Sequence, residues 1–458
     1  MEDISTEWIR DIIYQQRKFF STGSTKQIKF RLENLKNFRA AILKYEEKIS
    51  EALWTDLRKS YEETFLTEIN IVLAEIKIHI RNLIYWAKPQ SIETPFVLLP
   101  SSSRIIYEPL GVSLIMAPWN YPFQLLMNPL VGAISSGCTA ILKPSPYTAT
   151  VAQVMQEMIS ETFDPEYITL VQGNRRVNEM LLNEKFDFIF YTGSPNVGKV
   201  VMKAASRNLT PTVLELGGKC PCIVDKSANV NIAAKRIAWG KGINAGQTCI
   251  APDYLLVHED IKDELILKIG NSFEKMYGAD FEKSKHYPRI VNIQAFNRLT
   301  ELLKSGKIFY GGSVNSEEKF ISPTIIVDVD PEDKIMKEEI FGPILPVISF
   351  SEIKEAIEFV SDREKPLALY YFGNHKNAKE VINETSSGST CINDDIIQFA
   401  NLNLPFGGVG NSGMGKYHGK YSFQAFSNTR SIVKTPVWID IPFRYPPFKY
   451  FKIVKKIV

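Results

Sequence analysis

Two distant segments of the chain carry a thiol and a carboxyl group in settings that suit covalent catalysis. Cys249 ends the run Asn-Ala-Gly-Gln-Thr-Cys at residues 244–249, and Glu215 lies in Val-Leu-Glu-Leu-Gly-Gly-Lys at residues 213–219. A thiolate can attack a carbonyl carbon, and a carboxylate whose pKa is raised by burial can afterwards activate water against the thioester. The two segments therefore predict a cysteine nucleophile and a hydrolytic base.

Each of these residues also has a plain structural interpretation. A lone cysteine is usually a small buried apolar residue, and an acid at a domain boundary commonly pairs with a lysine or arginine. The Cys220-Pro221-Cys222 spacing is a weak metal signal with no histidine nearby, so we expect no metal site. Sparse cysteines in odd number predict reduced thiols and a cytoplasmic location, and residues 1–5 show no signal-peptide pattern. The cysteines that we expect to be structural are Cys138, Cys220, Cys222 and Cys391.

A glycine-containing turn at residues 193–199, Gly-Ser-Pro-Asn-Val-Gly-Lys, follows a predicted strand and precedes a predicted helix. It nearly spells a P-loop, but Val200 stands where a serine or threonine would hold magnesium, which disfavours a nucleoside triphosphatase. A turn at a helix N-terminus suits backbone donors beside a pyrophosphate, although it can also be a simple strand-to-helix turn. Residues 408–413 match G-x-G-x-x-G but follow no predicted strand, so we interpret them as a loop.

The apolar pattern predicts the elements that must position these residues. Apolar residues at every third or fourth position between Leu32 and Leu53 indicate one face of a long amphipathic helix. From about residue 111, short apolar runs alternate with helical patterns, which predicts a parallel sheet with helices on both faces. A second α/β block begins near residue 214 and extends to about residue 400. The expected strands of the first block are 112–117, 140–143, 168–172 and 186–191, and its expected helices are 121–135, 148–161, 176–183 and 196–205.

The charge balance of the chain favours a small-molecule substrate. Its 458 residues include 54 Lys plus Arg and 51 Asp plus Glu, so the net charge of +3 predicts no nucleic-acid partner. Residues 109–142 carry no charge, and a segment of that length could cross a membrane. Pro118, Pro122 and Pro129 would break such a helix and expose polar groups to lipid. We expect a buried strand, a loop and a buried helix instead.

Six ordered motifs connect these observations. They are Pro118-Trp119-Asn120, Lys143-Pro144-Ser145, Glu215 to Lys219, Gly246 to Cys249, Glu338 to Pro343, and Pro405 to Gly408. In this order they resemble the aldehyde dehydrogenase superfamily over residues 105–425. The short N-terminal part and the extended tail resemble its class 3, fatty-aldehyde-type branch, which is usually dimeric. The resemblance implies an α/β fold with a Rossmann-like, parallel-sheet NAD(P)-binding domain (1–86 and 107–213), an α/β catalytic domain (214–404), and bridging or oligomerisation segments (87–106 and 405–458).

The resemblance also implies an activity, the NAD(P)-dependent oxidation of an aldehyde to its acid through a cysteine thiohemiacetal and a thioester. Cys249 would be the nucleophile and Glu215 the base, while the Asn120 amide and the Cys249 backbone N–H would stabilise the oxyanion. A coenzyme A-acylating dehydrogenase and a cysteine hydrolase are the alternatives. Glu215, placed for hydrolysis, argues against the first, and the second usually needs a histidine partner that no motif here supplies.

Cofactor contacts are implied in the same way. Lys143 would bind the adenosine ribose, Glu339 (or its neighbour Glu338) the nicotinamide ribose, and Phe341 would pack near that ribose. Pro146 stands where many NAD-preferring relatives have an acid, so the resemblance implies NAD, NADP or both. The full expected set is Trp119, Lys143, Gly193, Ser194, Pro195, Asn196, Val197, Gly198, Leu216, Glu339 and Phe341.

The C-terminal segment 448–458 interleaves aromatic and aliphatic residues with lysines. That composition is compatible with peripheral contact to an anionic membrane surface, and packing on the partner subunit of a homodimer is the alternative. Membrane contact would favour a long apolar aldehyde. Tyr121, Leu125 and the residues near Thr390 are candidates for an apolar access tunnel. We therefore expect a medium- or long-chain, or otherwise apolar, aldehyde as the substrate.

Overall fold

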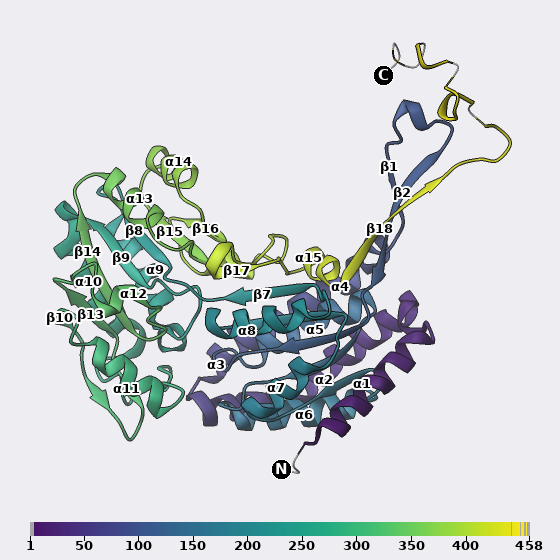
Figure 1. The fold of residues 1–458 in the computed structure, drawn as a ribbon. Helices are drawn as coiled ribbons and strands as arrows, with labels where there is room; N and C mark the ends of the chain where they lie inside the picture. Colours follow the sequence, from purple (N-terminus) through teal and green to yellow (C-terminus); the bar gives the residue numbers. More distant parts are fainter. Residues whose placement is uncertain (1–3, 441, 449, 453–454, 456–458) are drawn as a thin grey trace.

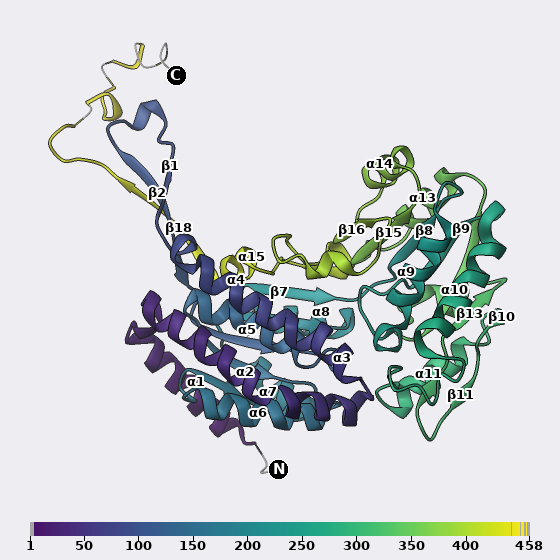
Figure 2. The same cartoon turned by 180° about the vertical axis from the view of Figure 1, so that it is seen from behind.

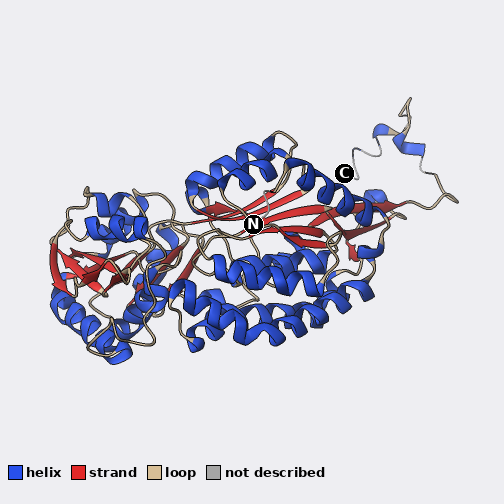
Figure 3. Ribbon diagram, turned by 90° about the horizontal axis from the view of Figure 1, so that it is seen from below, coloured by secondary structure: helices blue, strands red, loops and turns tan. Residues whose placement is uncertain are grey.

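The chain forms two α/β bodies and a thin arm that projects away from them (Figure 1). The computed structural model describes residues 4–440, 442–448, 450–452 and 455. The first body contains a six-stranded sheet and the second a seven-stranded sheet, and helices flank the strands of both (Figure 3). This architecture confirms the predicted α/β fold.

The six-stranded sheet has the order β17-β7-β6-β3-β4-β5, and only its edge strand β17 runs antiparallel to its neighbour. Each strand and helix predicted between residues 112 and 206 is present. The uncharged stretch forms β3, a loop, α5 and most of β4, and nearly all of its residues are buried. The strands are β3 Val112–Met116, β4 Thr139–Lys143, β5 Ile168–Leu170, β6 Phe188–Gly193, β7 Thr212–Leu216 and β17 Gly413–Met414, and the connecting helices are α5 Gln124–Ser136, α6 Ala149–Thr162, α7 Arg175–Asn183 and α8 Pro195–Ser206.

Helices cover both faces of this sheet. The predicted amphipathic helix is α2 (Ile28–Leu57), and its apolar stripe packs in one core with α4, α5 and α6 (Figure 2). On the other face, α1 packs with α7 and α8 over a second core. The remaining N-terminal elements are α1 Thr6–Ser21, α3 Tyr61–Thr64, a π-helical turn Phe65–Ile69 and α4 Asn70–Trp86.

The seven-stranded sheet has the order β10-β13-β14-β9-β8-β15-β16 and is parallel except for β10. It confirms the second α/β block, but the boundary predicted between residues 213 and 214 falls inside β7, which belongs to the first sheet. The strands are β8 Pro221–Val224, β9 Tyr254–His258, β10 Lys307–Tyr310, β13 Thr324–Val327, β14 Ile344–Phe350, β15 Ala368–Phe372 and β16 Ser389–Ile392. Around them lie α9 Val230–Gly242, α10 Lys262–Tyr277, α11 Ile293–Leu302, α12 Lys334–Lys337, α13 Ile353–Ser361, α14 His375–Glu384 and the hairpin β11 Val314–Asn315 with β12 Phe320–Ile321.

The arm is an antiparallel sheet of β1 (Gln90–Ile92), β2 (Ser102–Pro109) and β18 (Ser427–Lys434), which follows α15 (Lys420–Ala425). It stands clear of both bodies in two opposite views (Figures 1 and 2). Among the described residues, no helix combines the length and apolarity that a membrane crossing requires. Part of the segment predicted to contact a membrane or a partner lies outside the described residues, namely 449, 453–454 and 456–458.

Candidate active site

A cavity of about 260 Å³ lies where the first sheet meets the second body. Its wall contains all three residues predicted to be catalytic, together with six of those expected to bind the cofactor. It also contains eight further residues, most of them apolar or aromatic. The predicted residues in the wall are Asn120, Glu215, Cys249, Trp119, Gly193, Ser194, Leu216, Glu339 and Phe341, and the others are Pro118, Leu125, Thr192, Gly217, Leu367, Phe399, Phe406 and Tyr417.

Glu215 lies on β7, between β6 and β17, where Thr192 and Gly413 are its strand partners. Its side chain is buried, and neither carboxyl oxygen has a hydrogen-bond partner among the described residues. Burial therefore raises the pKa of Glu215 well above its ordinary value, and the charge of Lys416 offsets only part of this effect. A carboxylate with a raised pKa is a stronger proton acceptor, which is the property of a general base.

One of the two strand partners of Glu215 comes from residues 408–413, for which the sequence pattern predicts a loop. Residues 408–413 contain a short 3-10 turn, Gly410–Ser412, and then enter β17, where Gly413 pairs with Glu215. A β-carbon at Gly408 would lie 2.0 Å from the Ser412 carbonyl oxygen, so this glycine serves a tight turn. Residues 408–413 therefore have a structural role: they form the turn and the short strand that pair with β7, which carries Glu215.

Cys249 follows a backbone segment that is held in an unusual conformation. Asn244 and Ala245 have φ angles of 50° and 51°, a left-handed conformation that costs about 1–2 kcal/mol per non-glycine residue. The Glu63 carboxylate accepts the Asn244 backbone N–H (2.8 Å), and the Asn244 side chain donates to the carbonyl oxygens of Asn120 (2.7 Å) and Gln247 (3.1 Å). These bonds stabilise the turn that presents the sulfur to the cavity.

The sulfur of Cys249 is held as a thiol in this state. Burial raises the pKa of Cys249, and the nearby charges of Glu339 and Glu215 raise it further. Attack on a carbonyl therefore requires that the thiol proton first pass to a base. Both carboxyl groups are cavity residues and have raised pKa values, so either can accept it.

Asn120 lies in the loop between β3 and α5 and is buried. Its side-chain amide donates one hydrogen to the carbonyl oxygen of Gln247 (3.0 Å), two residues before the nucleophile. This bond orients the amide beside the Cys249 turn and leaves its second hydrogen for a ligand. Such a fixed donor is suited to an oxyanion.

Glu339 and Phe341 form another part of the cavity wall. Arg298 binds the carbonyl oxygens of Glu339 and Ile340, and the Ile340 N–H donates to Asp253 (2.9 Å). Burial, reinforced by the charge of Asp253, raises the pKa of Glu339 to about 8. The Phe341 ring packs edge-on against Trp119, with centroids 5.3 Å apart. The predicted acid and both predicted aromatic residues therefore share this wall.

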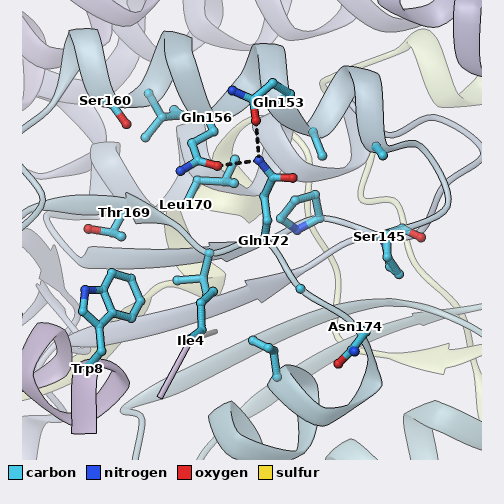
Figure 4. Close-up of a pocket in the computed structure, with 18 of the residues that line it drawn as sticks. Ile4, Trp8, Ser145, Gln153, Gln156, Ser160, Thr169, Leu170, Gln172 and Asn174 are labelled. Atoms are coloured by element: carbon cyan, nitrogen blue, oxygen red, sulfur yellow. Dashed lines mark hydrogen bonds between the residues drawn. The ribbon is translucent and has the colours of Figure 1, made fainter. Parts of the chain in front are cut away.

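Lys143 lies away from this cavity, beside a larger groove of about 1140 Å³. Its ammonium group donates to the carbonyl oxygens of Pro144 (2.7 Å) and Gly173 (2.8 Å), and both of these residues line the groove. Burial lowers the pKa of Lys143 to about 8. Figure 4 shows the groove between Trp8 on one side and the amides of Gln153, Gln156 and Gln172 on the other.

The residues of the glycine turn at the end of β6 have two different positions: some line the cavity, and the others begin α8. Gly193 and Ser194 line the cavity, and the Ser194 hydroxyl caps α8 by accepting the Val197 N–H (3.4 Å). Pro195, Asn196, Val197 and Gly198 form the first turn of α8 and are not cavity-lining residues. A β-carbon at Gly198 would lie 2.7 Å from Leu216, so this glycine allows the helix to pack closely on β7.

These segments share one edge of the first sheet. Residues 118–120, 144–146, 172–174, 193–194 and 217 follow the carboxyl ends of β3, β4, β5, β6 and β7. The strand order runs outward in opposite directions from β3 and β6, which creates the crevice where α/β sheets bind dinucleotides. The α8 N-terminus opens at this crevice and suits a pyrophosphate. The residues present therefore fit NAD or NADP.

Several residues of the site carried no recognisable motif. The Tyr121 hydroxyl hydrogen-bonds the hydroxyl of Thr248 (2.7 Å), next to the nucleophile. Leu125, Phe399, Phe406 and Tyr417 give the cavity an apolar side. Of the residues expected in an access tunnel, Leu125 lines the cavity, whereas Tyr121 and Thr390 do not. Phe406 belongs to the Pro405 to Gly408 motif, whereas Phe399 and Tyr417 lie outside all six motifs and are identified as cavity residues only through the fold.

Comparison with known proteins identifies the family. The sequence model of the Aldehyde dehydrogenase family matches residues 1–432. The chain is 48% identical over 451 residues to 4,4'-diaponeurosporen-aldehyde dehydrogenase of Staphylococcus aureus, covering 98% of both chains. It is 42% identical over 442 residues to the dimeric NADP-preferring aldehyde dehydrogenase of Canis lupus familiaris, covering 96% of this chain and 98% of that one.

A solved structure gives the same result. The substrate-bound state of Staphylococcus aureus AldH is similar with a TM-score of 0.96 and 47% identity, and the match covers 98% of this chain and 99% of that one. The predicted resemblance to class 3 is thereby confirmed. The chain belongs to the aldehyde dehydrogenase family, in its class 3, fatty-aldehyde-type branch, and is an oxidoreductase that oxidises an aldehyde to its carboxylic acid with NAD or NADP.

Proposed function

We propose that Cys249, Asn120 and Glu215 carry out the reaction. The single observation that supports this assignment is their convergence in one cavity, although they come from three separate segments. The Cys249 thiol gives its proton to a cavity carboxylate, and the sulfur adds to the aldehyde carbon. The Asn120 amide and the Cys249 N–H then donate to the oxyanion of the thiohemiacetal.

The second half of the reaction releases the acid. A nicotinamide held between Trp119, Glu339 and Phe341 would supply the hydride acceptor for the substrate carbon. Loss of that hydride leaves the acyl group on Cys249 as a thioester. Glu215 then takes a proton from water, the water oxygen attacks the thioester, and the sulfur leaves as the thiolate. The buried, unpartnered carboxyl group of Glu215 supports this role, and it favours hydrolysis over transfer to coenzyme A.

Replacement of the nucleophile tests the assignment. We expect Cys249→Ala to abolish NAD(P)H formation from an aldehyde. The control is Cys391→Ala, which replaces a half-buried cysteine on β16 and should leave NAD(P)H formation unchanged. Normal activity of Cys249→Ala would refute the proposal. Product analysis with and without added coenzyme A separates the hydrolytic from the acylating reaction.

We also propose that different parts of the chain bind the cofactor and supply the nucleophile. Residues 1–86 and 107–213 would bind the cofactor, and residues 214–404 would supply the nucleophile. Trp119, Gly193 to Gly198, Leu216, Glu339 and Phe341 would surround the nicotinamide and pyrophosphate. Lys143 would face the adenosine ribose from its position by the larger groove, supported by its place at the end of β4.

The apolar lining supports an apolar aldehyde as substrate, of medium or long chain length. The relative from Staphylococcus aureus is named for a 4,4'-diaponeurosporen aldehyde, and we extend that class of substrate to this chain. A series of linear aldehydes of increasing length tests this proposal. We expect kcat/KM to rise with chain length, and a preference for short polar aldehydes would refute it.

Residues 87–106 and 405–458 would join two subunits into a homodimer in the cytoplasm. Phe96, Val97 and Trp438 on and beside the arm are 75%, 56% and 76% exposed, which is unusual for large apolar side chains. The relative from Canis lupus familiaris is named as dimeric. Sedimentation of the full chain tests the dimer, and liposome binding tests peripheral membrane contact of the tail as the alternative.

A further inference from the structure

A fully buried ion pair lies directly behind the Asn120 loop. The Lys59 ammonium group donates to the Glu68 carboxylate over 2.6 Å, and neither side chain is exposed. Lys59 is in the connection between α2 and α3, and Glu68 is in the π-helical turn Phe65–Ile69. Single π-helical turns are rare and occur frequently at functional sites. Because burial of two charges is costly, stability alone is a weak reason for such a pair.

Both members of the pair bind the main chain of the Asn120 loop. The Lys59 ammonium group donates to the Asn120 carbonyl oxygen (3.2 Å) and lies 4.2 Å from the centre of the Tyr121 ring. The second oxygen of Glu68 accepts the N–H groups of Phe123 and Gln124, each over 3.0 Å. The pair therefore fixes the chain from Asn120 to the start of α5 at four points.

The same carbonyl oxygen connects this loop to the nucleophile turn. Asn120 accepts a hydrogen bond from the Asn244 side chain (2.7 Å) as well as from Lys59. Glu63, one helical turn before Glu68, accepts the Asn244 backbone N–H (2.8 Å). Residues 59–68 thus bind both loops, and neither Lys59 nor Glu68 is among the residues that line the cavity.

We propose that Lys59 and Glu68 are positioning residues for the oxyanion hole. They fix the main chain at Asn120, so that its side-chain amide keeps the orientation set by Gln247 and meets the oxyanion without rearrangement. A donor of this kind is effective only when it is preorganised, and a displacement of about 1 Å can cost about 100-fold in rate. This inference depends on the proposed roles of Asn120 and Cys249.

The test separates positioning from folding with a double variant. Lys59→Met removes the cation and leaves Glu68 as an unpaired buried charge, which destabilises the protein. Lys59→Met combined with Glu68→Gln removes both charges and keeps an acceptor for the α5 N–H groups. We expect the double variant to melt close to the wild type. The control is Arg17→Gln, which breaks a partly buried pair with Asp187 (2.9 Å) in the same body.

Two measurements, the rate of aldehyde oxidation and the rate of Cys249 alkylation, then distinguish an effect on the oxyanion hole from an effect on the nucleophile. Oxidation of hexanal passes through an oxyanion, whereas alkylation of Cys249 by iodoacetamide does not. In the double variant we expect kcat to fall about tenfold or more, while the KM for the cofactor and the alkylation rate stay within about twofold. Arg17→Gln should change neither readout.

Two results would overturn the inference. One is a double variant with the wild-type kcat. The other is an alkylation rate that falls in parallel with kcat, since the pair would then support the nucleophile turn in general. If the double variant does not fold, Lys59→Arg and Glu68→Asp, which keep both charges but shift the bonding atoms, serve the same test. Normal activity of Asn120→Ala would refute the proposed function instead, whatever Lys59 and Glu68 do.

Discussion

The side-chain amide of Asn120 and the main-chain oxygen of Gln247 are joined by a hydrogen bond of 3.0 Å. This bond connects the loop after β3 to the turn that carries Cys249, although the two residues are 127 positions apart in sequence. It fixes an N–H donor in the cavity that Cys249 also lines, before any substrate arrives.

Removal of the Asn120 amide should affect the chemical step more than binding. We expect Asn120→Ala to lower kcat by about 10²–10³-fold, equivalent to about 3–4 kcal/mol of transition-state stabilisation, with little change in the KM for the cofactor. Steady-state kinetics with hexanal measures both parameters. Asn208→Ala, an exposed residue after α8, is the control. A loss confined to KM would contradict the oxyanion role.

Loss of the Glu215 carboxyl should stop the reaction after hydride transfer. In Glu215→Gln we expect one rapid burst of NAD(P)H followed by very slow turnover, because the thioester forms but water is not activated. Stopped-flow absorbance measures the burst. The variant should be at least as stable as the wild type, since it removes a buried carboxyl group without partners. Steady turnover at the wild-type rate would exclude Glu215 as the base.

The reactivity of Cys249 should depend on the two carboxyl groups beside it. Negative charge at Glu339 and Glu215 raises the pKa of the thiol, so replacing either acid by glutamine should lower that pKa. The rate of iodoacetamide alkylation, followed against pH, should therefore rise at lower pH in Glu339→Gln and Glu215→Gln than in the wild type. A shift in the opposite direction would contradict this electrostatic picture.

His418 should make stability depend on pH below neutrality. It is buried among aromatic rings, and burial lowers its pKa from 6.5 to about 4. Between these values the unfolded chain binds a proton that the folded chain does not, so stability is lost as pH falls from 6.5 to 4. The loss amounts to about 3 kcal/mol. Denaturant unfolding of His418→Phe should lack this contribution, and an identical pH dependence in both proteins would refute it.

An acid at position 146 should change the choice of cofactor. Pro146 is exposed and follows Lys143 by three residues at the larger groove. We expect Pro146→Glu to lower kcat/KM for NADP by about tenfold while NAD is unaffected, because the carboxylate repels a 2'-phosphate. Asn208→Ala, at an exposed position outside the groove, is the control. If the ratio of kcat/KM for NAD to kcat/KM for NADP did not change, the 2'-position of the adenosine ribose would not lie near residue 146.

Local patterns in the sequence predicted the elements but not the contacts between them. Each strand and helix between residues 112 and 206 has its own apolar period, and this period is a property of neighbouring residues. The bond from Lys59 to the Asn120 carbonyl joins residues 61 positions apart, and no spacing rule indicates it. The two-residue strand β17 was likewise missed, because it exists only through its pairing with β7. Long-range contacts of this kind depend on the fold as a whole.

The most direct test of the central claim is to trap the covalent intermediate on Cys249. Glu215→Gln would be mixed with hexanal and cofactor, and its intact mass and proteolytic peptides would be measured. We predict that the protein gains the mass of the aldehyde less two hydrogen atoms, in the peptide that contains Cys249 and only when the cofactor is present. An unmodified Cys249, or an acyl group on another cysteine, would contradict the account.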